Sequence, residues 1–138
     1  MFPTIAITGA TGFIGGALAK RLTPSDWKIK ALIRAESLHK QHQDITAQWV
    51  AGDLEDIESL QSLVTGAEVI VHCAGAVRGA SQSDFDRANV DGVQRLVRIA
   101  AQQTPQPRFL LISSLAAREP ELSHYAASKF KGEKVLAS

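Results

Sequence analysis

The stretch TGATGFIGG, from Thr8 to Gly16, constrains the fold of this chain more than any other part of its sequence. Its glycines at positions 9, 12 and 15 follow a short apolar segment and precede an amphipathic one. Glycines at such a junction allow a tight turn and let backbone N–H groups approach a pyrophosphate, with the positive end of a helix behind them. The sequence therefore predicts a strand, a dinucleotide-binding loop and a helix. The alternative is a glycine-rich turn without a ligand.

Short apolar segments alternate with longer amphipathic ones along the whole chain, which is typical of a parallel sheet crossed by helices. We expect strands at Thr4–Thr8, Lys28–Arg34, Gln48–Ala51, Val69–Cys73 and Phe109–Ser113. We expect helices at Phe13–Leu22, Ser37–Gln43, Ile57–Val64, Phe85–Gln102 and His124–Ala137. Because crossovers between parallel strands are right-handed, these units predict an α/β fold of the Rossmann type. It is a doubly wound parallel sheet of about five strands with helices on both faces and a ligand at the carboxyl ends of the strands.

Length and composition indicate one globular domain that spans residues 1–138. The chain is 45% apolar and 21% charged, close to the average for globular proteins. Its 15 basic and 14 acidic side chains give a net charge of +1 and are mixed along the sequence, which disfavours nucleic acid and membrane surfaces as partners. A single cysteine, Cys73, excludes an intramolecular disulfide, and no segment is typical of a signal peptide, so a cytoplasmic location is expected.

Arg34 stands at the end of the second expected strand, where an NAD-binding domain carries an acidic residue for the ribose 2′-hydroxyl. A guanidinium can bond bidentately to the oxygens of a 2′-phosphate. The sequence therefore favours NADP, with NAD as the alternative. Arg34 could also be a solvated side chain neutralised by Glu36.

The chain resembles the short-chain dehydrogenase/reductase superfamily, in the extended or atypical branch of NAD(P)-dependent epimerases, dehydratases and reductases. The matching motifs occur in family order over essentially the entire chain: TGATGFIG (Thr8–Gly15), GDL (Gly52–Leu54), HCAGA (His72–Ala76), NVDGVQRLV (Asn89–Val97), ISS (Ile112–Ser114) and YAASK (Tyr125–Lys129). In this family the sheet continues with a further strand, and later residues build most of the substrate pocket. We therefore expect this chain to be the amino-terminal portion of a longer protein, with an exposed apolar edge where the next strand would pair.

The resemblance implies a set of cofactor-binding residues. Asp53 and Leu54 match the pair that contacts the adenine ring, and Asn89 matches the asparagine that holds the architecture near the catalytic lysine. The whole expected set is Gly9, Thr11, Gly12, Phe13, Ile14, Gly15, Arg34, Asp53, Leu54, Ala74, Gly75, Ala76, Tyr125 and Lys129. Two alternatives stay open: Asp53 could instead cap the following helix, although Asp56 is better placed, and Asn89 could be a solvated helix residue.

The expected catalytic residues are Ser114, Tyr125 and Lys129, with Asn89 in support. Tyr125 and Lys129 are four residues apart, so they lie on one face of a helix. An adjacent ammonium favours the phenolate form of a tyrosine and makes it a usable proton carrier. By resemblance, Ser114, rather than Ser113, hydrogen-bonds the substrate oxygen while hydride passes to or from nicotinamide C4.

The expected substrate is a small hydroxyl or carbonyl compound, of which a sugar nucleotide is one candidate, and a homodimer is one candidate assembly. The alternative function is a non-enzymatic NAD(P)-binding sensor or assembly module. His39, His42, His72 and His124 lack partners at ligand spacing, so no metal site is expected. Reduction, epimerisation and dehydration cannot be told apart from these residues.

Overall fold

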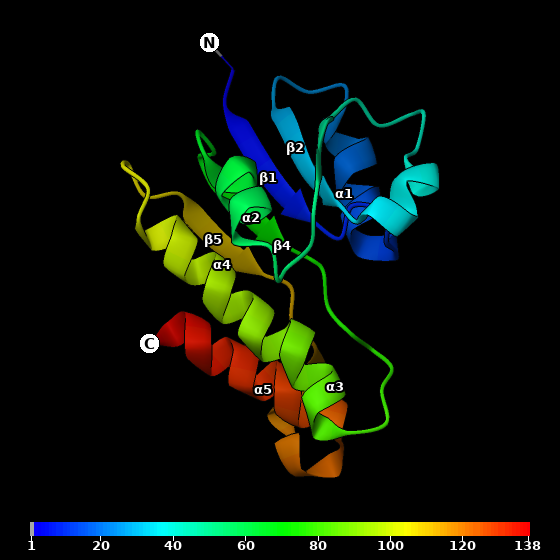
Figure 1. Ribbon diagram of the computed structural model, residues 1–138, viewed down its shortest axis with the longest axis vertical. Coiled ribbons are helices and arrows are strands. Elements are labelled where there is room, and N and C mark those ends of the chain that lie inside the picture. The colour runs from blue at the N-terminus through cyan, green and yellow to red at the C-terminus, as the bar shows by residue number, and fades with distance from the viewer. Residues whose placement is uncertain (1) are drawn as a thin grey trace.

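A parallel sheet forms the centre of the computed structural model, which describes residues 2–138 (Figure 1). The strands are β1 (Thr4–Thr8), β2 (Lys28–Ile33), β3 (Gln48–Ala51), β4 (Val69–His72) and β5 (Arg108–Leu111). They lie in the order β3-β2-β1-β4-β5, and each ladder is parallel. The chain leaves β1 toward β2 on one side and returns to β4 on the other, so a crevice opens at the carboxyl ends of β1 and β4. The predicted fold is confirmed.

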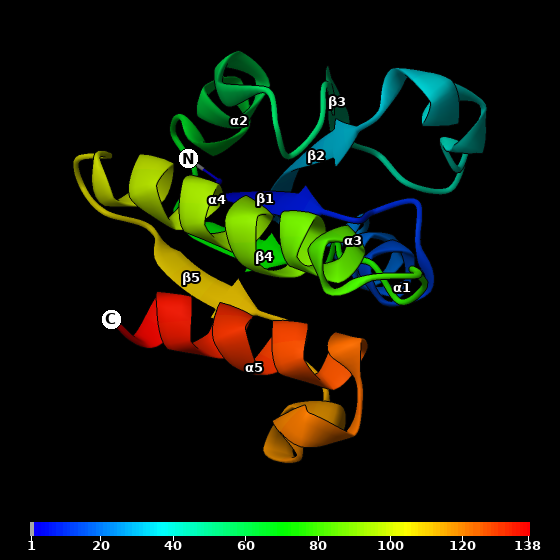
Figure 2. The ribbon, with the colours of Figure 1, turned by 60° about the horizontal axis from the view of Figure 1, so that its bottom comes forward.

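Helices cover both faces of the sheet because successive strand side chains point to opposite faces. Ala6 of β1 and Ile70 of β4 pack on one face beneath α2 (Ile57–Val64) and α4 (Gly92–Ala101). Ile5 and Ile7 pack on the other face beneath α1 (Phe13–Leu22). Figures 1 and 2 show α4 lying between α2 and α5 (His124–Ala137).

The expected helix Phe85–Gln102 is wrong as a single element. The chain forms α3 (Gln82–Asp86), a π-helical turn over Arg87–Asp91, and then α4. A π turn inserts an extra residue without interrupting the apolar period that a sequence shows, and such turns occur mostly at functional sites. Here the insertion turns Asn89 into the interior, where its side chain is 2% exposed.

Smaller differences concern element ends. The expected helix Ser37–Gln43 is a 3₁₀ helix over Ala35–Lys40. Three strands stop before their expected last residues, so Arg34, Cys73 and Ser113 lie just beyond β2, β4 and β5. The last paired residues of the β4–β5 ladder are His72 and Leu111. Beyond them, the Ile112 N–H still donates to the His72 carbonyl.

Within residues 2–138, β5 is an edge strand whose ladder partner is β4. Leu110 in this strand is 50% exposed. One exposed leucine is ordinary for a protein surface, so the expected apolar edge stays a prediction.

Gly132 lets α5 approach the π turn closely. A Cβ atom at this position would overlap the carbonyl oxygen of Asn89 and lie 3.8 Å from Val93 Cγ2. The distance between α5 and the π turn therefore depends on a missing side chain.

We expect Gly132→Ala to destabilise the fold by about 1–3 kcal/mol, because the added methyl group must push α5 away from a backbone atom. Urea unfolding monitored by circular dichroism measures this loss. Gly16→Ala is the comparison variant with the same gain in helix propensity, since its Cβ would make a tight contact at 3.2 Å with the Ala10 carbonyl oxygen but no overlap, so its loss should be smaller. Equal stability of the two variants would show that α5 does not need this close approach.

Candidate functional site

A cavity of about 440 Å³ opens at the carboxyl ends of the strands. The glycine loop, the ends of β2 and β3 and the turn after β4 contribute its walls. Its lining includes these expected cofactor-binding residues: Gly9, Thr11, Gly12, Arg34, Asp53, Leu54, Ala74, Gly75 and Ala76. The remaining lining residues are Leu32, Ile33, Ser37, Cys73 and Ala88. The structure thus brings most of the expected set together around one cavity.

The glycine loop is shaped by backbone packing. Gly9 has φ +75°, and a Cβ there would lie 2.7 Å from the Ala74 nitrogen. A Cβ at Gly15 would overlap the Gly9 carbonyl oxygen. Gly12 is the N-cap of α1 and makes no side-chain cap bond, so the first N–H groups of α1 receive no side-chain acceptor from it and can face an anion.

Two expected members of the cofactor set, Phe13 and Ile14, do not line the cavity. Phe13 is 95% exposed and Ile14 is 55% exposed at the start of α1. Gly15 does not line the cavity either, and it is buried beneath the loop. The backbone of this turn, rather than its large side chains, faces the cavity.

Asn89 connects the cavity to α5. Its Oδ1 accepts the N–H of Ala76, and its Nδ2 donates to the Ala76 carbonyl and to Ser128 Oγ, each at 2.9 Å. Ser128 Oγ then donates to the Tyr125 carbonyl at 2.7 Å. The interpretation of Asn89 as a solvated residue is therefore wrong. Sequence reasoning missed Ser128, although it lies inside the YAASK motif.

Lys129 lies beside the cavity wall. Its side chain is 8% exposed, and Nζ donates to the Ile112 carbonyl at 3.0 Å. A Cβ at Gly75 would lie 3.9 Å from this Nζ. Burial lowers the pKa of Lys129, and the negative charge of Glu133 opposes that shift. The ammonium is thus held, partly desolvated, at the junction of α5 with the turn after β4.

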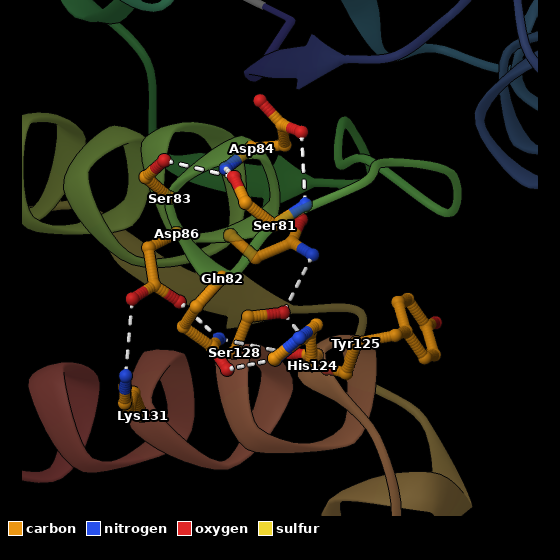
Figure 3. A network of polar contacts seen from close by, with 10 residues as sticks. Ser81, Gln82, Ser83, Asp84, Asp86, His124, Tyr125, Ser128 and Lys131 are labelled. Atoms are coloured by element: carbon orange, nitrogen blue, oxygen red, sulfur yellow. Dashed lines mark hydrogen bonds and ion pairs between the residues drawn. The ribbon is translucent and has the colours of Figure 1, made fainter.

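Tyr125 begins the same helical face and is half-buried. Its ring meets the Phe85 ring edge-on, with 6.1 Å between centroids and 68° between planes. Figure 3 shows the ring projecting away from Lys131, toward the end of the network at which α5 begins. Neither Tyr125 nor Lys129 lines the 440 Å³ cavity, and only Lys129 is placed next to a lining residue, through the approach of its Nζ to Gly75.

The two serines after β5 differ in their contacts. Ser114 Oγ accepts the N–H of Ala116 at 3.1 Å and begins a 3₁₀ turn. Ser113 Oγ donates to Glu133 Oε2 at 2.5 Å. Ser113 is therefore occupied by a carboxylate, while the Ser114 hydroxyl proton has no protein acceptor within residues 2–138.

A polar network joins α3 to the first turn of α5 (Figure 3). Gln82 Nε2 donates to Asp86 Oδ1 at 2.8 Å and to the His124 carbonyl at 3.0 Å. Gln82 Oε1 therefore acts as an acceptor, and His124 Nδ1, 2.9 Å away, donates to it. Asp86 also pairs with Lys131 at 3.0 Å. His124 begins α5 as expected, and Gln82 is a contact that the sequence did not indicate.

Arg34 lines both the main cavity and a neighbouring one of about 300 Å³. Its guanidinium lies 3.7 Å from Glu36, and Arg87 in the second cavity lies 3.7 Å from Glu55. All four side chains are more than half exposed, so these pairs are weak. The helix α2 is capped by Asp56 and not by Asp53. Asp53 lines both cavities, and its side chain accepts the Glu55 N–H.

His72 lies beneath the cavity as a buried polar residue. Its Nδ1 is 2.6 Å from Thr8 Oγ1, and the side chain is 0% exposed. Burial lowers the pKa of His72 to about 4, with a smaller contribution from the charge of Lys129. Cys73, expected as a buried strand residue, is half-buried just past β4, and burial raises its pKa.

Two classes of site receive no support from the residues that the structure describes. No group of three His, Cys, Asp or Glu side chains in residues 2–138 could hold a metal ion. None of the helices in that range combines the length and the apolar character needed to span a bilayer.

A family model described as the NAD dependent epimerase/dehydratase family matches residues 5–138. A ceramide reductase from Caulobacter vibrioides is 43% identical over 129 residues, covering 94% of this chain and 40% of that protein. This chain therefore spans less than half the length of that relative.

Solved structures show the same fold. WbmH from Bordetella bronchiseptica, in complex with NAD+, has a TM-score of 0.83 at 19% identity, covering 99% of this chain and 52% of its own. An actinorhodin polyketide ketoreductase with NADPH has a TM-score of 0.78 at 22% identity, and the match covers 94% of this chain and 60% of the ketoreductase chain.

We expect the stability of the chain to fall in acid partly through His72. Its pKa is about 4 when folded and 6.5 in the unfolded chain, so the unfolded chain takes up this proton at a higher pH. Stability from this group is complete above the unfolded value and falls as the pH drops toward the folded value, by about 3 kcal/mol. Urea unfolding across this range measures the loss.

His72→Leu should remove this part of the pH dependence, because leucine does not titrate. Other groups contribute equally to both proteins, so the difference between the two curves isolates His72. Parallel curves would show that the imidazole is not desolvated in the folded chain.

Proposed function

Because the chain belongs to the NAD-dependent epimerase/dehydratase family, we propose that it is the cofactor-binding part of an NAD(P)-dependent oxidoreductase of the short-chain dehydrogenase/reductase type. The approach of Lys129 Nζ to Gly75 carries the proposal. At this point the helix with the proton-transfer residues meets the cavity lined by the glycine loop. A dinucleotide in the cavity would thus extend toward Tyr125 and Lys129.

The residues around the cavity fit such a cofactor. The uncapped start of α1 and the loop from Gly9 to Gly12 offer N–H groups to a pyrophosphate. Asp53 and Leu54 suit the adenosine end, and Ala74 to Ala76 suit the ribose and phosphates. When bound, the nicotinamide supplies or accepts the hydride.

The chain's own side chains handle the proton. The Tyr125 hydroxyl donates a proton to, or accepts one from, the substrate oxygen. The Lys129 ammonium, four residues along the same helix, is buried beside the turn after β4 and offers a positive charge at the edge of the cofactor site. The Ser114 hydroxyl, at the end of β5, hydrogen-bonds the substrate oxygen and orients it.

For the substrate, the likeness to the ceramide reductase favours a long-chain hydroxyl or carbonyl compound over a sugar nucleotide. Oxidation and reduction of ceramides are therefore the first reactions to assay. Arg34 favours NADP as the cofactor, since its partner Glu36 is exposed and can be displaced by a phosphate.

Binding of NADPH should raise the melting temperature of the chain more than the same concentration of NADH. We expect Arg34→Ala to weaken NADPH binding by about 10- to 100-fold, because a charge-assisted bond contributes about 1.5–3 kcal/mol, and to leave NADH binding unchanged. Thermal-shift titration measures both. Arg21→Ala, in the last turn of α1, is the control with the same charge change. No shift with any nicotinamide cofactor would contradict the proposal.

Tyr125→Phe should lower turnover by at least about 100-fold and leave cofactor affinity nearly unchanged, because it removes the proton carrier but keeps the ring against Phe85. Steady-state kinetics with a ceramide and fluorescence titration with NADPH separate the two effects. Turnover is measured on the full-length protein. If it binds cofactor but turns over no ceramide, other carbonyl compound or sugar nucleotide, and the variant changes nothing, a sensor or assembly module is the better assignment.

A further inference from the structure

The hydroxyl of Thr8 organises the junction between the glycine loop and the turn after β4. Thr8 Oγ1 accepts the N–H groups of Cys73 and Ala74, each at 3.1 Å. A hydroxyl oxygen has two acceptor lone pairs and one proton. The Cys73 N–H also bonds the Thr8 carbonyl at 3.2 Å. With N–H groups facing both lone pairs of the hydroxyl, the arrangement that fits is donation of the Thr8 proton to His72 Nδ1, 2.6 Å away.

This pattern fixes the tautomer of His72. An acceptor at Nδ1 means that the neutral ring carries its proton on Nε2. That Nε2 is buried and has no hydrogen-bond partner among residues 2–138. The Phe109 ring lies beside the imidazole, with 6.4 Å between centroids. A buried donor without an acceptor is unfavourable, so His72 does not serve stability better than an apolar side chain would.

The unfavourable burial of His72 Nε2 accompanies an ordered contact at the cavity wall. Cys73 and Ala74, whose N–H groups Thr8 holds, belong to its lining, and so does Gly9, the residue after Thr8. A Cβ at Gly9 would lie 2.7 Å from the Ala74 nitrogen, so the two loops meet backbone to backbone. The Cys73 N–H keeps the Thr8 carbonyl as an acceptor, so a rotated Thr8 hydroxyl, with its proton turned toward the N–H groups, would weaken chiefly the bond to Ala74.

We propose that His72 is a positioning residue for the cofactor: by accepting the Thr8 proton it keeps the Thr8 oxygen facing the Cys73 and Ala74 N–H groups. The turn after β4 is thereby held against the glycine loop at the spacing that the cavity needs. The inference rests on the proposed function, because it takes the cavity to be the cofactor site. His72 itself does not line that cavity.

Replacement of His72 by leucine separates positioning from stability. His72→Leu removes the acceptor and also the buried Nε2–H. We expect NADPH affinity to fall by about fivefold, the equivalent of one net hydrogen bond. The melting temperature without ligand, at neutral pH, should be equal to or higher than that of the unchanged chain. A merely structural histidine would lose stability as well.

A matched polar pair keeps the test decisive if the leucine variant folds poorly. His72→Asn places an amide oxygen near the position of Nδ1, and His72→Gln places it near the position of Nε2. We expect the asparagine variant to retain NADPH affinity within about twofold and the glutamine variant to lose it as leucine does. Thr8→Ser, which keeps the hydroxyl, should bind NADPH as the unchanged chain does.

The outcomes are distinguishable. If the unchanged chain binds no nicotinamide cofactor, the proposed function fails and the inference with it. If it binds NADPH and His72→Leu binds equally well, the proposed function stands and the inference is wrong. Equal losses of affinity in the asparagine and glutamine variants, together with lower melting temperatures, would also overturn it.

Discussion

The amide of Asn89 is the interaction on which the arrangement of the site depends. It satisfies both backbone groups of Ala76 and reaches Ser128, so one buried side chain ties the turn after β4 to α5. A helix of ordinary pitch would carry position 89 onto another face, and the π turn supplies the one-residue shift that directs it inward. Gly132 then allows α5 to lie against that turn. Local backbone geometry and long-range packing therefore depend on each other here.

A second set of contacts holds α5 from its other end. Gln82, Phe85 and Asp86 of α3 meet His124, Tyr125 and Lys131, with polar bonds on one side and ring packing on the other. His124 and Lys131 are exposed while Gln82 and Asp86 are half-buried, so each bond contributes little by itself. Together with the buried Asn89–Ser128 contact they leave the first turn of α5 few ways to move. The position of Tyr125, the proposed proton carrier, is thus set by contacts within the chain itself.

The sequence predicted two kinds of feature: elements with a regular apolar period, and turns whose backbone requires glycine. Buried parallel strands read as apolar runs, and the loop glycines mark a turn that other residues cannot make, as the φ of +75° at Gly9 shows. The sequence did not predict the π turn, because residues 85–102 keep one helical apolar period through it. Nor did it indicate Gln82 or the tautomer of His72, since both depend on which polar groups the folded chain brings within bonding distance.

The contacts of Gly9, Gly15 and Ala74 have a consequence for how freely such a chain can change its sequence. Main-chain atoms form this side of the cavity, and their close packing depends on the absence of Cβ atoms at Gly9 and Gly15. Elsewhere, side chains need only fill volume and keep their alternation. A surface specified by so few positions leaves most of the chain free to vary. Chains that share about a fifth of their residues with this one, at 19% and 22% identity, have the same fold, with TM-scores of 0.83 and 0.78.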